Sequence, residues 1–416
     1  MRFHIITYGC QMNVCDSDWL SRALRSRGWK ETGEEDAQVV ILNTCSVREK
    51  PETKVYSQIG RYRDRWENDP DFFVAVGGCV AQQVGKELWS RFPYVRLVFG
   101  TDGLIMVPNA MDRLAEEPGL RTSFLDFQDY YPERETFLSG SDAQPSAFVN
   151  IMQGCNNFCA YCIVPYVRGR QKSRRSTDVI RECRELLDQG VQEITLLGQN
   201  VNSYGQDPFG DSVSFSDLLK KVAHLDGLKR LRFTTSHPKD LDPDVIQAFS
   251  ELPVLCPHLH LPLQSGSDRI LAEMRRKYST RDYLEKVTAL QESCPGISLS
   301  TDLIVGFPGE TDDDFQKTLE MIHRVGFESS FSFKYCDRPG VRAEKMDGKV
   351  DEQVKSERLR ILQELQENLT RKKLSCLVGT EQEVLIHSRS VWSAKGSDSW
   401  QGRDRHGRII HVRTNG

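Results

Sequence analysis

Short apolar runs recur in the first part of the chain, and a helical pattern follows each of them. The runs are Phe3–Tyr8, Val39–Asn43 and Phe72–Val76. An Asp16-Ser17-Asp18 cluster, which is typical of a helix start, precedes the first helical pattern. Because strands that alternate with helices favour a doubly wound parallel sheet, we predict an α/β domain over residues 1–120.

From Ser146 onward the alternation continues as six strand-then-helix units. The predicted strands are Ala147–Met152, Glu193–Leu197, Arg230–Thr234, His258–Leu263, Ser298–Val305 and Ser330–Tyr335. The predicted helices include Thr177–Leu187, Phe215–Leu225, Asp242–Phe249, Arg281–Gln291 and Asp312–Val325. Repeated βα units predict a parallel barrel over residues 146–375, with functional groups on the loops that follow the strands.

Residues 121–145 are predicted to form a linker, because Ser, Gly, Asp and Pro accumulate at 138–145. A charged helical pattern at about Asp351–Lys373 closes the barrel region.

The last segment, residues 376–416, is predicted to be a small β module. Its two β patterns are Gln382–His387 and Arg408–Val412. Trp392 and Trp400 lie between them among arginines and histidines, a composition that suits RNA contact through phosphate binding and stacking.

Of the 416 residues, 38% are hydrophobic and 27% are charged, which is ordinary for a globular protein. No run of about 18 apolar residues occurs, and the first residues pass directly into polar sequence, so neither a membrane span nor a signal peptide is predicted. We therefore predict a cytoplasmic protein, in which thiols stay reduced and 12 cysteines indicate metal binding or catalysis. Because the formal net charge is −4, nucleic acid would be bound only through local basic patches.

Three cysteines with C-x3-C-x2-C spacing, Cys155, Cys159 and Cys162, form the loop triplet. Three thiolates can hold three irons of a 4Fe–4S cluster and leave the fourth iron open, whereas electron-transfer ferredoxins use four cysteines. A zinc site would show paired C-x2-C units or nearby histidines. The spacing therefore predicts an open iron–sulfur cluster, and three unrelated structural thiols are the alternative.

Three further cysteines, Cys10, Cys45 and Cys79, each follow one N-terminal strand and form the sheet triplet. Because the carboxyl ends of parallel strands lie along one edge of a sheet, these distant cysteines should converge. Glycines before Cys10 and Cys79 let the backbone approach a bulky inorganic group. We predict a second three-cysteine iron–sulfur site, with three buried apolar cysteines as the alternative. Cys15 is excluded because it falls within the following helix.

Polar or glycine-rich tails follow three of the barrel strands. They are Gly198-Gln199-Asn200, Gln264-Ser265-Gly266-Ser267 and Gly306–Glu310. Such groups suit a polar cofactor, or they satisfy the backbone of their own loops. A basic run at Arg168–Arg175 follows the loop triplet and predicts phosphate contacts. Alternatively, the run is an ordinary solvent-exposed basic surface, or one of its arginines binds a carboxylate.

Four motifs carry a resemblance to a known family. They are Tyr8–Asn13 (YGCQMN), Asn43–Lys50 (NTCSVREK), Gly77–Gln82 (GGCVAQ) and Gln153–Tyr166 (QGCNNFCAYCIVPY). The aromatic Tyr161 before the third cysteine resembles the radical S-adenosylmethionine (SAM) superfamily. Together the motifs resemble the methylthiotransferases, most closely the MiaB-type tRNA-2-methylthio-N(6)-dimethylallyladenosine synthases. The similarity runs from Arg2 to beyond Arg338, and the C-terminal module resembles a TRAM domain, which binds RNA.

The resemblance implies a partial (β/α)6 barrel and two 4Fe–4S clusters, one on each triplet. At the loop triplet, SAM would be cleaved to a 5′-deoxyadenosyl radical that removes hydrogen from C2 of N(6)-dimethylallyladenosine next to the tRNA anticodon. The cluster of the sheet triplet would carry the sulfur, which a second SAM methylates. The residues implied to contact SAM are Tyr161, Gln199, Asn200, Gln264, Ser265 and Gly306.

The implied partners are the tRNA anticodon stem-loop, an electron donor such as flavodoxin or ferredoxin, and a sulfur donor. Related enzymes act on threonylcarbamoyladenosine in tRNA or on a ribosomal protein, and these are alternative functions. An iron–sulfur electron carrier is disfavoured by the open coordination sites. The sequence departs from the family at Gln171, where Glu is usual, at Cys336, where Ser is usual, and in its short C-terminal module.

Overall fold

The computed structural model describes residues 1–46, 51–135, 144–390 and 399–413. The N-terminal domain is built on a six-stranded parallel sheet with the order β2-β1-β3-β4-β5-β6. The strands are β1 (Arg2–Thr7), β2 (Lys30–Glu31), β3 (Val39–Thr44), β4 (Phe73–Gly78), β5 (Val95–Phe99) and β6 (Thr122–Phe124). The helices are α1 (Gln11–Ser26), α2 (Pro51–Gly60), α3 (Arg63–Asn68), α4 (Cys79–Val84), α5 (Glu87–Arg91) and α6 (Val107–Glu116), with short 3-10 turns η1 (Glu34–Asp36) and η2 (Asp102–Met106).

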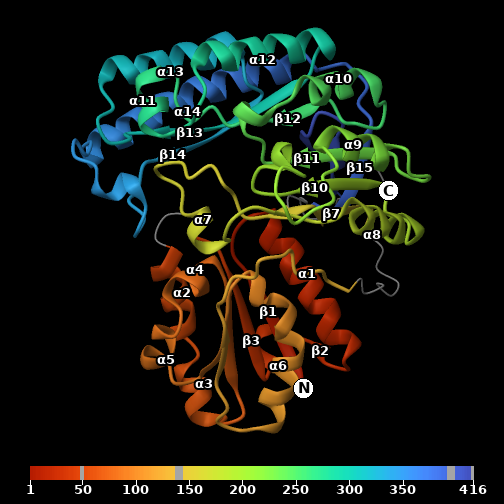
Figure 1. Cartoon of the computed structure of the whole chain (residues 1–416), viewed down its shortest axis with the longest axis vertical. Helices are drawn as coiled ribbons and strands as arrows, with labels where there is room; N and C mark the ends of the chain where they lie inside the picture. Colours follow the sequence, from red (N-terminus) through yellow and green to blue (C-terminus); the bar gives the residue numbers. More distant parts are fainter. Residues whose placement is uncertain (47–50, 136–143, 391–398, 414–416) are drawn as a thin grey trace.

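Helices cover both faces of this sheet (Figure 1). In β3, Val39 and Ile41 pack with α1 and α6 on one face, whereas Val40 and Leu42 pack with α2, α4 and α5 on the other. A strand that is buried on both faces needs an uninterrupted apolar run, which is the pattern seen in the sequence. The predicted doubly wound domain is confirmed.

The second domain is a partial barrel of six parallel strands. Two three-stranded sheets, β11-β10-β7 and β12-β13-β14, meet where Leu231 of β11 bridges to Leu255. The strands are β7 (Ser146–Asn150), β10 (Glu193–Leu197), β11 (Arg230–Thr234), β12 (His258–His260), β13 (Ser298–Val305) and β14 (Ser329–Lys334). The helices of eight or more residues are α8 (Ser176–Asp188), α9 (Phe215–Ala223), α10 (Pro243–Glu251), α12 (Thr280–Ser293), α13 (Asp312–Val325) and α14 (Glu352–Ser375). The shorter elements are β8 (Met152–Gln153), α7 (Val164–Val167), β9 (Lys172–Ser173), η3 (Val201–Ser203), η4 (Pro238–Asp240), α11 (Asp268–Glu273) and η5 (Arg342–Lys345).

The C-terminal module is a three-stranded antiparallel sheet of β15 (Val384–Arg389), β16 (Ser399–Asp404) and β17 (Ile409–Arg413). Arg230, the first residue of β11, donates to the Arg403 carbonyl at 2.8 Å, and Arg232 donates to the Asp404 carbonyl at 2.6 Å. The turn between β16 and β17 therefore lies against the amino ends of the barrel strands. This end is opposite the loops that follow the strands, where the loop triplet lies.

The structure contains strands that the sequence analysis did not predict, namely β2, β5, β6, β9 and β16. β6 lies inside the segment predicted to be a linker and pairs with β5 at the edge of the sheet. A strand of two or three residues leaves no readable hydrophobic pattern, so only its pairing reveals it. The fourth barrel strand ends at His260 instead of Leu263. The first helix begins at Gln11, so the Asp16-Ser17-Asp18 cluster lies inside α1 and the predicted start is wrong. The other predicted elements agree within two residues. Trp392, the linker residues 136–143 and the motif residues 47–50 lie outside the described residues.

Candidate active site between two cysteine triplets

The loop triplet lies on the loop between β8 and α7, after the first barrel strand. Gly154 has a φ of +78°, and a side chain at this position would overlap the Arg170 carbonyl oxygen. The Cys155 amide donates to the Gly169 carbonyl at 3.2 Å. Gly154 therefore lets the chain turn sharply and holds the cysteine loop against the segment that returns to the barrel.

The three thiols of the loop triplet influence one another. Burial raises the pKa of Cys155, and the neighbouring Cys159 adds to the rise. Burial likewise raises the pKa of Cys162 to about 12, with Cys159 as the next contribution. The Asn157 amide donates to Cys155 Sγ at 3.5 Å. Amide hydrogen bonds to sulfur are a feature of iron–sulfur sites, where they tune the potential of the cluster.

A buried arginine that the sequence analysis missed faces the loop triplet. Arg276 is 4% exposed, and its Nη1 lies 3.4 Å from Cys159 Sγ. Its Nε donates to the Tyr278 hydroxyl at 3.1 Å. The flanking Arg275 and Lys277 have φ values of +58° and +57°, which mark a constrained turn at a functional site. Because Arg276 stands among three consecutive basic residues, nothing in the sequence signals its burial.

The structure brings the sheet triplet together from three neighbouring strands. Cys10 is the N-cap of α1, Cys45 directly follows β3, and Cys79 is the first residue of α4. Because β1, β3 and β4 are adjacent, these three positions share the carboxyl edge of the sheet. A side chain at Gly9 would overlap Cys45, so glycine is required for this approach.

A second buried arginine, Arg168, faces the sheet triplet. Burial lowers the pKa of Arg168, but Cys79, Asp16 and the other two thiols raise it above its ordinary value. A hydrogen bond with Cys45 lowers the pKa of Cys10 to about 5 against the effect of burial, and the charge of Arg168 contributes. A permanent cation beside thiols favours the thiolate, which is the form that binds iron.

The basic run at Arg168–Arg175 is largely buried, and the predicted phosphate-binding surface is wrong for three of its five cations. These three are Arg168, Lys172 and Arg174. Lys172, for instance, lies 2.5 Å from Asp102 of the N-terminal domain. The run crosses the boundary between the domains, which supplies carboxylates and thiols as partners. Arg170 and Arg175 are exposed.

Gln171 has two hydrogen-bond acceptors within reach of its side-chain amide. Its amide nitrogen donates to the Ser203 carbonyl at 2.5 Å and lies 3.2 Å from an oxygen of Asp207. A glutamate here would place a second carboxylate against Asp207 and could donate to neither partner.

A cavity of about 180 Å³ lies beside the loop triplet, where the barrel faces the N-terminal domain. Tyr161 and Cys162 line it from the barrel loop, and Ser46, which follows the sheet triplet's Cys45, lines it from the N-terminal domain. Nearby, Cys79 packs with Ile163 in a small buried cluster. One cavity is therefore bordered by residues of, or next to, both triplets.

Two of the residues implied to contact SAM, Tyr161 and Gln264, line this cavity. Gln264 has a φ of +71°, which is uncommon for a residue other than glycine and marks a tight turn of the backbone after the fourth barrel strand. Cys336, which follows the sixth barrel strand, is exposed and lines the same cavity.

The other four implied SAM contacts are not among the residues that line the cavity. Gln199 Oε1 accepts from the Gly154 amide at 2.5 Å, which ties the cysteine loop to the second barrel strand. Asn200 Oδ1 is buried and has no hydrogen-bond partner within the described part of the chain. Ser265 is fully buried, and the Gly306 amide donates to a glutamate at 2.7 Å. These residues shape the loops around the site.

The donor chemistry of both triplets fits an iron–sulfur cluster. Nowhere in the described ranges do three His, Cys, Asp or Glu side chains converge closely enough to bind a single metal ion. Thiolates of a cluster bind different irons and need not converge on one point. Each triplet also has a buried guanidinium beside it, which offsets the negative charge of bound thiolates.

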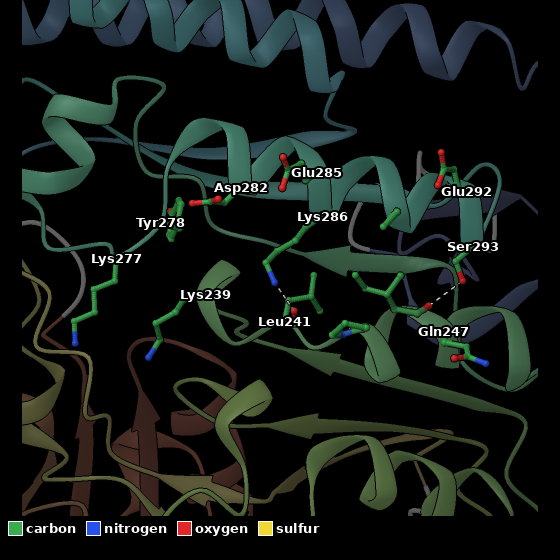
Figure 2. Close-up of a pocket in the computed structure, with 13 residues that line it drawn as sticks. Lys239, Leu241, Gln247, Lys277, Tyr278, Asp282, Glu285, Lys286, Glu292 and Ser293 are labelled. Atoms are coloured by element: carbon green, nitrogen blue, oxygen red, sulfur yellow. Dashed lines mark hydrogen bonds between the residues drawn. The ribbon is translucent and has the colours of Figure 1, made fainter.

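A larger cavity of about 690 Å³ lies outside the barrel, between α10 and α12, and is lined by none of the six cysteines. Figure 2 shows Lys286 extending from α12 toward Leu241, and its Nζ donates to the Leu241 carbonyl at 2.5 Å. The lining mixes lysines with carboxylates of α12 and contains no thiol or histidine. The smaller cavity, which Cys162 lines, is therefore the candidate active site.

Two family models match the chain. Residues 149–322 match the radical SAM superfamily, and residues 2–100 match an uncharacterised protein family, UPF0004. A tRNA-2-methylthio-N(6)-dimethylallyladenosine synthase from Nitratidesulfovibrio vulgaris is 58% identical over 410 residues, which cover 99% of this chain and 91% of that protein. The chain belongs to this family of radical SAM methylthiotransferases. Methylthiotransferases of the same name from Oleidesulfovibrio alaskensis (54% identity, 99% of this chain, 92% of that protein) and Geobacter sulfurreducens (46%, 98% and 90%) are also similar.

Solved structures share the fold at low identity. The radical SAM methyltransferase TsrM from Kitasatospora setae aligns with a TM-score of 0.59 and 13% identity over 82% of this chain and 74% of that chain. The cobalamin-dependent radical SAM enzyme OxsB aligns with a TM-score of 0.55 and 11% identity over 88% of this chain and 56% of that chain. At such identities the likeness extends to the fold alone. Within the described ranges, no helix has the length and apolar character needed to cross a membrane.

Proposed function

We propose that this methylthiotransferase adds a methylthio group to C2 of N(6)-dimethylallyladenosine next to the tRNA anticodon, with two SAM molecules and two 4Fe–4S clusters. The observation that carries this proposal is the cavity lined by Tyr161 and Cys162 of the cysteine loop and by Ser46, the residue that follows Cys45 of the sheet triplet. The substrate named for relatives at 46% to 58% identity supports the choice of nucleoside.

The reaction needs cofactors because an aromatic C–H bond has no acid–base route at neutral pH. When bound, the clusters and SAM would supply the radical chemistry that breaks the C–H bond and the sulfur for the new C–S bond. The loop triplet would hold the first cluster and the sheet triplet the second. The chain would thereby hold both groups near one cavity, so that the base could react with both while bound at a single site.

Contacts between the two domains support a fixed distance between the triplets. Arg168 of the barrel donates to Asn13 Oδ1 of the N-terminal domain at 2.8 Å. Lys172 pairs with Asp102, and Gln153 also donates to this carboxylate. Breaking a buried ion pair leaves an uncompensated charge, so these contacts disfavour relative movement of the domains.

We further propose that SAM binds in the 180 Å³ cavity against Tyr161 and Gln264, which line it. The remaining implied contacts, Gln199, Asn200, Ser265 and Gly306, would complete the site from the adjacent strand ends. The unpartnered Oδ1 of Asn200 supports a ligand on that side.

Binding of the anticodon stem-loop is proposed to involve the C-terminal module. Arg389, Arg403 and Arg413 are exposed on its sheet, and Arg389 lies 5.5 Å from the centre of the Trp400 ring. Cations next to an aromatic ring suit phosphate contact and base stacking.

An electron donor such as flavodoxin or ferredoxin, a sulfur donor and a cytoplasmic location complete the proposal.

Nucleoside analysis of tRNA tests this function. A strain that lacks the gene should accumulate N(6)-dimethylallyladenosine and lose its methylthio derivative, and the wild-type gene should restore the product. Loss of methylthiolated threonylcarbamoyladenosine instead would favour that alternative. Unchanged tRNA together with loss of a modification on a ribosomal protein would refute a tRNA substrate.

A further inference from the structure

Two phenylalanines on the inner wall of the barrel are exposed. Phe331 is 58% exposed and Phe333 is 44% exposed, although both lie on the barrel strand β14. Lys334, which points the other way, donates to Glu352 of α14 at 2.5 Å. β14 is the edge strand of its sheet, and exposed apolar side chains on a sheet edge mark a surface that a partner covers.

Polar groups lie directly beside the Phe331 ring. Phe331 is paired with Asp302 of β13, and its ring packs edge-on against His260 with 5.9 Å between ring centres. His260 Nε2 lies 3.4 Å from Asp302 Oδ2, and His260 Nδ1 lies 3.0 Å from Ser300 Oγ. The Asp302 side chain is 31% exposed, so an acceptor is available next to the aromatic surface.

This wall is continuous with the reaction cavity. Phe333, Ile304 and Asp302 line the cavity that also contains Cys162. Phe331 lies two residues earlier in β14, which places it one strand repeat further from the loop triplet. The two rings therefore form a strip that runs from the cavity into the barrel interior.

We propose that Phe331 and Phe333 hold the substrate base and that Phe331 selects an adenine with an apolar N6 substituent. This inference rests on the proposed function. In adenine, C2 and N6 lie at the two ends of one edge, separated by N1. With C2 at the cavity beside Phe333, the N6 substituent extends toward Phe331, and Asp302 can accept a hydrogen bond from N6–H. Stacking holds the base, and burial of the prenyl chain provides the selectivity.

The test compares two anticodon stem-loop RNAs that differ only in adenosine or N(6)-dimethylallyladenosine at the target position. Filter binding with full-length, cluster-loaded protein measures the ratio of the two affinities. Phe331→Ala should reduce the preference for the prenylated RNA by roughly tenfold, as expected when the apolar substituent no longer packs against a ring. Phe331→Leu should retain most of the preference. Phe209→Ala, at a phenylalanine that is 37% exposed on the loop between η3 and α9, is the matched control and should leave the ratio unchanged.

The outcomes separate this inference from the proposed function. An unchanged ratio in a folded Phe331→Ala protein overturns the role of the wall, even when the wild type makes the methylthio product. If alanine lowers the unfolding midpoint, Phe331→Gln replaces the ring with a polar chain and provides the same test. Absence of methylthio product from the wild type with the prenylated RNA overturns the proposed function, whichever RNA the variants prefer.

Discussion

The two cysteine triplets have similar surroundings but are built in different ways. The loop triplet lies on one loop, between Cys155 and Cys162, whereas the sheet triplet extends from Cys10 to Cys79 and is joined by the strand order β1-β3-β4. Each has one buried arginine nearby, Arg276 for the loop triplet and Arg168 for the sheet triplet.

This difference determines what each triplet depends on. Spacing and a single tight turn are sufficient to present the loop triplet, and Gly154 provides the turn. The sheet triplet exists only when the parallel sheet has formed, because its members come from three separate strands. Changes in the N-terminal core should therefore affect the sheet triplet first.

The largest expected effect comes from replacing the loop triplet. With Cys155, Cys159 and Cys162 changed to alanine, reductive cleavage of SAM should be abolished. Iron in the reconstituted protein should fall to roughly half of the about eight atoms that two 4Fe–4S clusters hold. Iron analysis and chromatography of 5′-deoxyadenosine measure this. Cys376→Ala, at an exposed thiol on another element, is the control, and full iron in the triple variant would contradict two independent clusters.

The sheet triplet should show a different loss. Cys10→Ala, Cys45→Ala or Cys79→Ala should block methylthio transfer while cleavage of SAM stays detectable, because the loop triplet lies in the other domain. Both products can be quantified in one chromatographic assay. Normal methylthio product from any of the three variants would refute a role for this triplet in sulfur transfer.

The interface that holds the triplets together should be sensitive to one buried charge. The side chains of Lys172 and Asp102 are 3% and 1% exposed, and Lys172→Met would leave the carboxylate without its cation. We expect a loss of about 3–5 kcal/mol in the free energy of unfolding. Denaturant unfolding measures it, and adding Asp102→Asn should recover part of the loss. Arg371→Ala, in an exposed ion pair of α14, should leave the midpoint unchanged.

The two buried arginines should have separate effects. Arg276→Met should weaken iron retention at the loop triplet, and Arg168→Met should do so at the sheet triplet, because each removes a donor or charge that faces its own thiols. A hydrogen bond to a charged group contributes roughly 1.5–3 kcal/mol. Iron release during dialysis, followed in variants that retain one triplet, measures the two effects. Equal release from both triplets in either variant would mean that the arginines act through general stability.

The smallest effect is expected on the C-terminal module. Arg389→Ala, Arg403→Ala and Arg413→Ala should each lower the salt dependence of stem-loop binding by roughly one unit of log–log slope, because each removes one cation that pairs with a phosphate. SAM cleavage without RNA should stay normal. Substitutions are preferable to truncation, because the module also packs against Arg230 and Arg232 at the end of the barrel. Unchanged slopes would exclude this face from RNA binding.

Local sequence was sufficient for the alternation of strands and helices and for the spacing of the loop triplet. Both are properties of neighbouring residues, since a strand buried on both faces needs an apolar run and a cluster loop needs closely spaced thiols. The convergence of Cys10, Cys45 and Cys79 also followed from the sequence, because parallel strands place their carboxyl ends on one edge. Short strands such as β6 were not predicted, because they are defined by hydrogen bonding to a neighbouring strand and are too short to show a hydrophobic pattern.

Burial of charge and the direction of side chains depended on packing between distant segments. The sequence predicted that Arg168 and Lys172 bind phosphate. In the structure they instead form ion pairs with Asp16 and Asp102 of the N-terminal domain. Arg276 faces a thiol more than a hundred residues earlier in the chain. The exposure of Phe331 follows from the open edge of the barrel. In each case the free-energy cost of burying or exposing a side chain depends on the residues that pack against it. Those residues are remote in sequence, so only the tertiary structure identifies them.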